Sequence, residues 1–474
     1  MAKRSKLSLF FAVLLAILLG CGGYLLFQDT TSPEISLSHT SEYVSPTLPI
    51  TVTVTDDKSA VKKISVIVRH NEKIIPIVET SFSDGAKSQQ LTFSLEKTGL
   101  KDSTFDLEVT AADASLGGFG FGNKITKIYP MRIDTTPPRI SMKSTTPYMR
   151  RGGSGCVVYS INKDVRQTGV KVGSFFFPAF RQPSGDYLCF FAFPYTLDTK
   201  DYQPQAVAID VAGNSQITEL SVSRIPRQFK TDTIEISQGF LDDKAAEFEA
   251  MVPGPMSDIE RFLKVNGEVR RSNAQALMEI GKDTAPEMLW KGAFLRMPKA
   301  ASRAGFADYR TYKWEGKKVD EQTHLGFDLA SLKNSPVPAA NNGKVVYTGY
   351  LGIYGNLVVI DHGLGLQSLY SHLSEIHVQK DQAVTKGDII GKTGATGMAG
   401  GDHLHFGILI SGLEVTPLEW LDDHWIKDNV IDRINAAGST APEFSVTSPS
   451  PDEGKPAAPA KPRQSRTPAK RPKR

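Results

Sequence analysis

The stretch His324-Leu-Gly-Phe-Asp328, together with His403-Leu-His-Phe later in the chain, decides the fold and chemistry of the C-terminal half of this 474-residue protein. Five side chains there, His324, Asp328, His372, His403 and His405, form the pattern of a metal-dependent hydrolase. Imidazole and carboxylate are ligands that Zn²⁺ prefers, and a catalytic zinc keeps only three protein ligands. Five candidates for three places leave two side chains for proton transfer, which indicates an enzyme rather than a structural metal site.

The spacing within each pair constrains the local structure. His403 and His405 are two apart on a predicted strand, so both side chains are expected on one face with Cα atoms roughly 7 Å apart. On a straight strand His324 and Asp328 would lie about 13 Å apart, too far to share one ion. We expect Gly326 to permit the bend that brings them together.

Short strand-like runs surround these pairs. Gly343-Lys-Val-Val-Tyr-Thr-Gly, Asn356-Leu-Val-Val-Ile-Asp and Val384-Thr-Lys-Gly-Asp-Ile-Ile-Gly are joined by glycine-containing turns. Residues 293–430 are therefore predicted to form an antiparallel β-sheet domain. His362 is interpreted as a turn residue, and His377 and His424 are given no chemistry.

A basic flank followed by an apolar run indicates a membrane segment at the N-terminus. Lys3, Arg4 and Lys6 precede an uncharged run over residues 7–27, which as a helix would span about 30 Å, the thickness of a bilayer core. We predict a retained single-span anchor within residues 1–28, with everything after it outside the cytoplasm. Lipidation at Cys21 is the alternative, because the preceding residues resemble a loose lipoprotein box.

A weak internal repeat follows. Ser32-Pro-Glu-Ile-Ser recurs as Pro137-Pro-Arg-Ile-Ser, and Val109-Thr-Ala-Ala-Asp-Ala recurs as Val207-Ala-Ile-Asp-Val-Ala. The period of about 100 residues is the size of an immunoglobulin-like sandwich. We predict two such domains, over residues 31–135 and 136–228. Cys156 and Cys189 lie in neighbouring strand-like stretches of the second, where either a disulfide or two buried thiols fit the sequence.

Two further segments complete a chain that is predicted to be mainly β. Helix signals fill residues 229–292, with capping-box starts at Ser257 and Ser272 and a stop at Gly281, so this insert is either a linker or a lid over the active cleft. Residues 437–474 are rich in Pro, Ala, Lys and Arg and are predicted to be disordered. After Glu453 eight basic residues and no acids occur, so the rest of the chain carries 4 − 8 = −4. Nothing indicates nucleic-acid binding.

Several blocks in order carry a resemblance to a known family. They include Pro336-Val-Pro-Ala-Ala, Tyr354-Gly-Asn-Leu-Val-Val-Ile-Asp-His-Gly, Tyr370-Ser-His-Leu-Ser and Gly394-Ala-Thr-Gly, besides the two histidine motifs. From about residue 293 to 425 the chain resembles the lysostaphin/LytM-type zinc endopeptidases that cut peptidoglycan peptides. The resemblance implies that His324, Asp328 and His405 bind Zn²⁺ and that His372 and His403 are the catalytic pair.

Asp402 and Gly407 depart from the family, which usually has Pro before the His-x-His motif and often Glu after its Phe. Neither position is a metal ligand in the family. The resemblance implies a peptidoglycan peptide substrate and a membrane-anchored enzyme acting outside the cytoplasm, with an envelope regulatory partner as a further expectation. Some relatives act only as activators of other wall hydrolases, so a non-catalytic wall-binding or amidase-activating regulator is the alternative.

Overall fold

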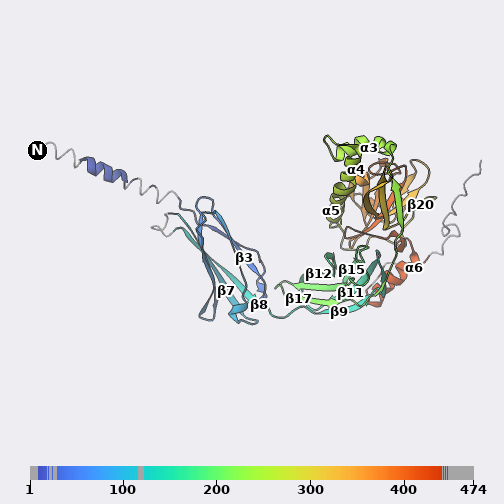
Figure 1. Cartoon of the computed structure of the whole chain (residues 1–474). Coiled ribbons are helices and arrows are strands. Elements are labelled where there is room, and N and C mark those ends of the chain that lie inside the picture. The colour runs from blue at the N-terminus through green and yellow to red at the C-terminus, as the bar shows by residue number, and fades with distance from the viewer. Residues whose placement is uncertain are drawn as a thin grey trace, which may run out of the picture. The chain divides into compact units, whose positions relative to one another are not determined.

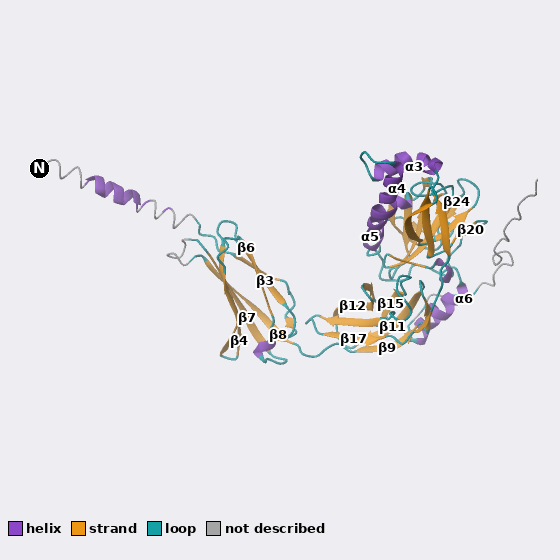
Figure 2. Ribbon diagram, in the orientation of Figure 1, coloured by secondary structure: helices purple, strands orange, loops and turns teal. Residues whose placement is uncertain are grey.

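The computed structural model describes residues 9–18, 20, 24, 29–115, 122–439, 441, 444 and 446. Within them the protein is mainly β, as predicted (Figures 1 and 2). The chain divides into two compact units. One comprises Met1–Ile140, Ile161–Thr168 and Val207–Ile217, and the other comprises Ser141–Ser160, Gly169–Ala206 and Thr218–Arg474. The predicted domain boundaries stay predictions.

Residues 9–18 are helical and carry exposed apolar side chains. In the part of the chain that the structure describes, no helix is both long and apolar enough to cross a membrane. The predicted span over residues 7–27 lies partly outside the described residues, and Cys21 lies outside them. Most of the predicted disordered tail, residues 437–474, also falls outside them.

Two facing sheets form a sandwich in the first unit. The first sheet has the order β1-β3-β6 and the second has the order β2-β8-β7-β4-β5. The strands are β1 (Glu34–Leu37), β2 (Tyr43–Val44), β3 (Ile50–Thr55), β4 (Val61–His70), β5 (Lys73–Ser81), β6 (Ser88–Phe93), β7 (Thr104–Asp113) and β8 (Lys124–Ile133). A 3₁₀ turn, η1, covers Glu96–Thr98. The alternation of the sequence explains the packing, because Ile50, Val52 and Val54 of β3 are buried in one core with residues from both sheets.

The next ten strands repeat this order. One sheet runs β14-β15-β11-β9, a second runs β13-β12-β16-β17, and β10 pairs in parallel with β18, as β2 does with β8. The strands are β9 (Ile140–Thr145), β10 (Tyr148–Arg150), β11 (Ser154–Ile161), β12 (Val165–Val172), β13 (Phe175–Pro178), β14 (Phe180–Arg181), β15 (Tyr187–Ala192), β16 (Gln205–Asp210), β17 (Ser215–Glu219) and β18 (Ser223–Ile225).

The register of β11 and β15 decides whether Cys156 and Cys189 can form a disulfide. Cys156 lies opposite Phe190, and Cys189 lies opposite Val157. Because neighbouring residues of a strand point to opposite faces, the two sulfur atoms lie on opposite sides of the sheet. Both thiols are free and buried, and burial raises the pKa of each. A disulfide between them is therefore excluded in this fold.

Helices of the insert cover one face of the C-terminal sheet. They are α3 (Gln238–Met251), α4 (Asp258–Lys264) and α5 (Arg270–Ile280), with a π-helical segment, η2 (Val265–Val269), between the last two. The capping box at Ser257 is confirmed, as is the stop at Gly281. The predicted start at Ser272 is wrong, because α4, η2 and α5 follow one another without a break and Ser272 lies inside the helical run.

An eight-stranded sheet carries the histidine motifs, with the order β20-β23-β31-β27-β26-β25-β29 and β32 paired to β31. Its strands are β20 (Ala301–Ala304), β23 (Phe327–Ala330), β25 (Gly343–Tyr350), β26 (Asn356–Asp361), β27 (Leu366–Ser371), β29 (Ala383–Val384), β31 (Leu404–Ile410) and β32 (Leu413–Val415). Phe248, Phe262 and Leu277 of the insert pack into one core with Leu369 and Leu409 of this sheet.

Two smaller sheets border it, with the orders β19-β21-β22 and β24-β30-β28. Their strands are β19 (Thr231–Glu235), β21 (Asp308–Trp314), β22 (Lys317–His324), β24 (Pro336–Pro338), β28 (Glu375–Ile376) and β30 (Ile389–Lys392). The remaining helical elements are η3 (Gly352–Tyr354), η4 (Pro417–Glu419), α6 (Asp423–Ile426), η5 (Lys427–Ile431) and α7 (Asp432–Ala436).

Glu419, the last residue of η4, links the segment after β32 to the start of β11, within the second unit. The backbone N–H of Ser154 donates a 2.8 Å hydrogen bond to Glu419 Oε2, and Trp420 Nε1 donates to Ser154 Oγ at 3.0 Å. Burial raises the pKa of Glu419 to about 7, although its hydrogen bonds from Ser154 act in the opposite direction. The folded protein therefore holds a proton there that an unfolded chain has released.

This proton makes folding stability depend on pH. Between pH 4.5 and about 7 the folded state binds more protons at Glu419, so its stability should fall as pH rises through that window. The substitution Glu419→Gln keeps an acceptor for Ser154 and removes the titration. We expect it to stabilise the second unit by roughly 2–3 kcal/mol at pH 8 and to have little effect at pH 4.5.

The measurement is the difference in chemical-denaturation midpoint between variant and wild type at each pH. The exposed Glu219→Gln serves as the matched control. A Glu419→Gln effect that is the same at both pH values would contradict the prediction.

Candidate functional site

Strand pairing brings the predicted metal ligands together. His324 is the last residue of β22, Asp328 lies in β23 and His405 lies in β31. β23 pairs with β31 so that Asp328 lies opposite His405. β27 pairs with the other edge of β31, where Ser371 lies opposite His405, and His372 follows directly. Residues that are 81 positions apart, such as His324 and His405, thus meet at one end of the sheet.

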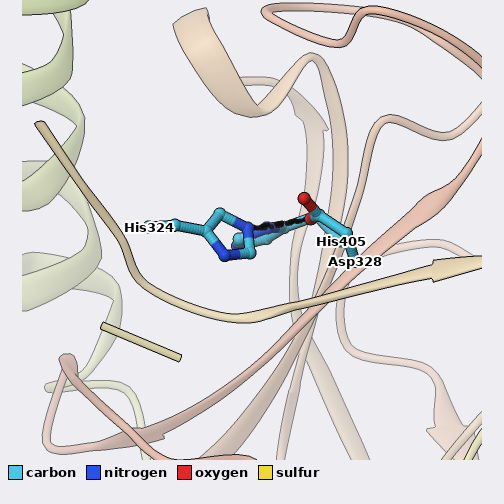
Figure 3. A group of neighbouring side chains, drawn as sticks. All are labelled: His324, Asp328 and His405. Carbon is cyan, nitrogen blue, oxygen red and sulfur yellow. Dashed lines mark hydrogen bonds and ion pairs between the residues drawn. The ribbon is translucent and has the colours of Figure 1, made fainter. Parts of the chain in front are cut away.

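Three ligand atoms converge, one from each of His324, Asp328 and His405 (Figure 3). His324 Nε2 lies 2.8 Å from Asp328 Oδ1 and 2.9 Å from His405 Nδ1. His405 Nδ1 lies 3.1 Å from the same oxygen. Ligands of a tetrahedral zinc at roughly 2.0–2.1 Å would lie about 3.3 Å apart. The observed triangle is a few tenths of an ångström tighter, so the three side chains fit a zinc ion with a small outward adjustment.

The tautomer of His324 strengthens this assignment. Its Nδ1 lies 2.8 Å from the carbonyl oxygen of Gly305, which only accepts, so Nδ1 carries the proton. In a neutral imidazole the lone pair of Nε2 then faces a carboxylate oxygen. Two acceptors at that separation require positive charge between them, either a second proton or a metal ion. A backbone carbonyl that fixes the tautomer is the usual support of a metal-bound histidine.

The Asp328 carboxylate is the electrostatic centre of the site. Burial acts to raise its pKa, but its contacts with His324, His403 and His405 outweigh burial and hold that pKa well below its usual range. Its second oxygen, Oδ2, accepts a 3.1 Å hydrogen bond from the guanidinium of Arg310 in β21. Asp328 is therefore ionised and oriented, which is the state that a metal ligand needs.

His372 and His403 stand beside this trio. Their ring centroids are 4.9 Å apart, and the ring of His372 lies 5.8 Å from that of His405. His372 Nδ1 donates to the carbonyl of Thr396 and His403 Nδ1 donates to the carbonyl of Gly401, both at 2.8 Å. Each ring therefore directs Nε2 away from its carbonyl partner, and Nε2 of His403 lies 3.4 Å from Asp328 Oδ1.

The two histidines differ electrostatically. Burial, aided by the neighbouring His403 and His405, moves the pKa of His372 well below its usual range. Burial also acts to lower the pKa of His403, but the contact with Asp328 outweighs it and raises that pKa. Burial lowers the pKa of His405 to about 4, so this ring is neutral and able to ligate a metal at neutral pH.

Gly326 acts differently from the prediction. Its backbone φ is not in the left-handed region, so the bend between His324 and Asp328 does not depend on glycine's conformational freedom. A Cβ at this position would instead lie 2.6 Å from both Cε1 and Nε2 of His405. Glycine is required there because the backbone approaches the imidazole closely, a contact that local spacing does not reveal.

The cavity around the site also contains residues that the sequence analysis missed. Arg270 and Ala274 of α5 line it, so the helical insert borders the site. Tyr354 lies over His405 with ring centroids 5.9 Å apart and donates to Glu414 at 2.9 Å. Arg270 and Ala274 belong to no quoted motif. Tyr354 opens one of the blocks that carry the family resemblance, but only the folded chain places its ring beside His405.

The other histidines of the region lie elsewhere. His362 is fully buried, with Nδ1 at 2.7 Å from the Asn342 carbonyl and Nε2 at 2.7 Å from Ser368 Oγ. Burial lowers its pKa to about 4. His377 contacts Glu375 at the surface, and His424 lies in α6. None of these three joins the converging group.

Comparison with known proteins agrees with this geometry. Residues 322–417 match the model of peptidase family M23. This segment of the chain belongs to peptidase family M23. The predicted resemblance to lysostaphin/LytM-type endopeptidases is thereby confirmed for what we now call the M23 domain.

Three curated relatives illustrate the range of roles. The DD-carboxypeptidase/endopeptidase Mpg of Neisseria meningitidis is 40% identical over 95 residues, which cover 20% of this chain and 22% of that protein. The peptidoglycan DD-endopeptidase ShyA of Vibrio cholerae is 40% identical over 96 residues, which again cover 20% of this chain and 22% of that protein. The murein hydrolase activator NlpD of Escherichia coli is 36% identical over 119 residues, which cover 23% of this chain and 31% of that protein. The match thus spans about a fifth to a third of each relative.

Solved structures give weaker likenesses. The catalytic domain of lysostaphin from Staphylococcus simulans is 28% identical, covering 26% of this chain and 92% of that one at a TM-score of 0.23. A putative M23 peptidase from Pseudomonas aeruginosa is 19% identical, covering 58% and 94% at a TM-score of 0.36. At these TM-scores the two likenesses add nothing to the sequence match.

The close approach at Gly326 yields a direct test. We expect Gly326→Ala to displace the His405 ring and to lower the zinc content of the purified protein several-fold, because the new methyl group would overlap the imidazole. Metal content by mass spectrometry is the measurement. Gly239→Ala is the matched control, since a Cβ there meets nothing within 4 Å. Equal zinc in both variants would show that the close approach is unimportant.

Arg310 offers a second test at the metal site. Removing the guanidinium with Arg310→Met leaves Asp328 Oδ2 without its donor and should weaken zinc binding by about 10–100-fold, the usual effect of losing such a supporting contact. Competition with a chromophoric chelator measures the affinity. Arg303→Met, which alters an exposed arginine of β20, should bind zinc as tightly as wild type.

Proposed function

We propose that the protein is a zinc-dependent endopeptidase that hydrolyses peptide cross-links of peptidoglycan in the cell envelope. One observation carries the proposal: His324, Asp328 and His405 converge on a point where an ion fits, while His372 and His403 stand beside it and contribute no atom to that group. The family match and the relatives named as DD-endopeptidases support the substrate class.

The chemistry divides between metal and side chains. Zinc supplies a Lewis acid that polarises a peptide carbonyl and acidifies water. The imidazoles of His372 and His403 share the remaining work. One accepts the proton of the attacking water and passes it to the leaving amine, and the other donates a hydrogen bond to the developing oxyanion. Burial of both rings keeps these contacts in a water-poor environment, where they are stronger.

A non-catalytic regulator is the second candidate, because a relative of similar identity is named a murein hydrolase activator. Retention of all five side chains in one converging arrangement favours the enzyme. An activator needs neither a metal trio nor two histidines whose tautomers are fixed by carbonyls.

We also propose that the M23 domain acts outside the cytoplasm, carried by a single-span anchor. The basic flank before residue 7, the apolar run that follows it and the exposed apolar side chains of residues 9–18 support this location. An envelope regulatory partner belongs to the same proposal. Arg270 and Ala274 place the helical insert at the cleft, where a bound partner would reach the active site.

Substitution of His405, His403 and His372 separates a metal ligand from the two acid–base groups. We expect His405→Ala to lose both zinc and hydrolysis of purified peptidoglycan. His403→Ala and His372→Ala should each keep zinc while turnover falls by about 10²–10⁴-fold, the usual contribution of a general acid or base. Zinc content and mass analysis of the released muropeptides are the two measurements.

His377→Ala is the control, since this exposed histidine lies in the same domain and outside the site. Complete loss of zinc from His403→Ala or His372→Ala would overturn the division of roles. A zinc-loaded wild type that leaves peptidoglycan intact, yet increases the activity of an added amidase, would establish the regulator instead.

A further inference from the structure

A second group of metal-ligating side chains lies at one end of the first sandwich, remote in sequence from the M23 domain. Asp29, Asp56 and Asp113 each offer a carboxylate oxygen, and the three oxygens lie within 4.8 Å of one another. Asp29 precedes β1, Asp56 follows β3 directly and Asp113 ends β7. Asp56 is 6% exposed and Asp113 is fully buried.

Most hydrogen-bonding capacity in this group is used, with one exception. Asp113 Oδ1 accepts from the backbone N–H of Ser115 and of Asn123, and its Oδ2 accepts from Asn123 Nδ2 at 2.9 Å. Asp29 Oδ1 accepts from Thr31, and its Oδ2 accepts from the hydroxyl of Ser59.

Asp56 is the exception. Its Oδ1 accepts from the backbone N–H of Lys58 and Ser59, whereas its Oδ2 is buried without a hydrogen-bond partner in the described part of the chain. A buried carboxylate oxygen without a donor or a cation is costly. The charge of the group adds to this cost. Within the described ranges no lysine or arginine forms an ion pair with any of the three carboxylates, and the charge of Lys58 acts on Asp29 only from a greater distance.

The internal repeat allows the carboxylate group of the first sandwich to be compared with its equivalent in the second. Asp29-Thr-Thr-Ser-Pro-Glu-Ile-Ser and Asp134-Thr-Thr-Pro-Pro-Arg-Ile-Ser are equivalent, so Asp134 corresponds to Asp29. Asp113 ends β7 as Asp210 ends β16. In the second copy a lysine ammonium lies between the two carboxylates, because Lys163 Nζ is 2.6 Å from both Asp134 Oδ2 and Asp210 Oδ2.

The supporting contacts are also repeated. Asn214 N donates to Asp210 Oδ1 at 2.8 Å, and Asn214 Nδ2 donates to the Asp134 carbonyl and to Asp210 Oδ2. Asn123 makes the same set of contacts with Asp113 and with the carbonyl of Asp29. The two copies thus share one carboxylate pair and one asparagine clamp. They differ in the third group, which is a lysine after β11 and an aspartate after β3.

We propose that Asp29, Asp56 and Asp113 bind one Ca²⁺ ion, which takes the place that the Lys163 ammonium occupies in the second copy. All donors are oxygens, which suit a hard cation rather than zinc. Ca²⁺ takes about six to eight oxygens at roughly 2.3–2.6 Å, so oxygens on opposite sides of it lie about 4.6–5.2 Å apart. Mg²⁺ demands a tighter octahedron and retains water, so Ca²⁺ fits this carboxylate group better.

Bound Ca²⁺ fastens the segment before β1 to the end of the sandwich. Asp29 belongs to that segment, whereas Asp56 and Asp113 belong to the two sheets. The ion therefore closes a link between the entry of the chain and the first folded domain. The proposal is independent of zinc and of peptidase activity.

The test is calorimetric titration of CaCl₂ into the purified full-length protein after treatment with EGTA. We expect saturable binding of one Ca²⁺ with an affinity about tenfold or more above that for Mg²⁺. Asp56→Asn and Asp113→Asn should each weaken binding by about tenfold or more, since each removes one ligand charge. The exposed neighbour Asp57→Asn is the matched control and should bind as wild type does.

Asp56→Lys reproduces the second copy and separates binding from folding. We expect this variant to bind no Ca²⁺ at the site, while its thermal unfolding midpoint in EGTA rises to that of Ca²⁺-loaded wild type. Far-UV circular dichroism in EGTA checks the fold of each variant. Where Asp56→Asn or Asp113→Asn is unfolded, Asp29→Asn decides, because Asp29 lies outside the strands.

Three results would overturn the proposal: no saturable Ca²⁺ binding by wild type, unchanged binding by the folded aspartate variants, or equal affinity for Mg²⁺. Ca²⁺ taken up by the M23 domain would remain in all three aspartate variants, so it cannot imitate the expected loss.

Discussion

The carboxylate of Asp328 is the contact on which the candidate active site depends. One oxygen lies within about 3 Å of ring nitrogens from His324 and His405, and the other accepts from Arg310. This arrangement exists only because β23 and β31 pair with Asp328 opposite His405. A slip of one residue would turn every side chain of β31 to the other face and separate the ligands. The chemistry therefore depends on strand register more than on any single side chain.

The three predicted metal ligands lie together in the fold, with His372 and His403 beside them, because the sequence signals that single them out are local. His403-Leu-His-Phe is a strand motif that directs two imidazoles to one side, and the spacing of His324 and Asp328 required a bend. The sequence analysis missed the site contacts that are made by residues far apart in the chain. Arg310 and Tyr354 meet the site through the folded sheets, and the role of Gly326 is set by a ring 79 positions away. Periodicity carries no information about such close approaches.

The same distinction applies to the fold. Alternation in β3 and the repeated motifs predicted a mainly β chain, and the capping box at Ser257 predicted a helix start. Ser272 has the same local pattern but lies inside a helical run, because packing of α5 against the sheet overrides a capping preference worth only about 1 kcal/mol. The sequence could not decide between a disulfide and two free thiols at Cys156 and Cys189 for a related reason. The register of the two strands decides which face of the sheet each sulfur occupies.

The repeat adds an argument about how one scaffold solves an electrostatic problem in two ways. Two aspartates and an asparagine clamp recur at the end of each copy, so both copies need a cation to neutralise them. A lysine provides that charge permanently, because its ammonium is part of the chain. An aspartate at the third position instead makes the charge an exchangeable ion, whose occupancy follows its concentration. The first sandwich, which follows the N-terminal helix in the chain, is thus the copy whose rigidity depends on the concentration of a free cation.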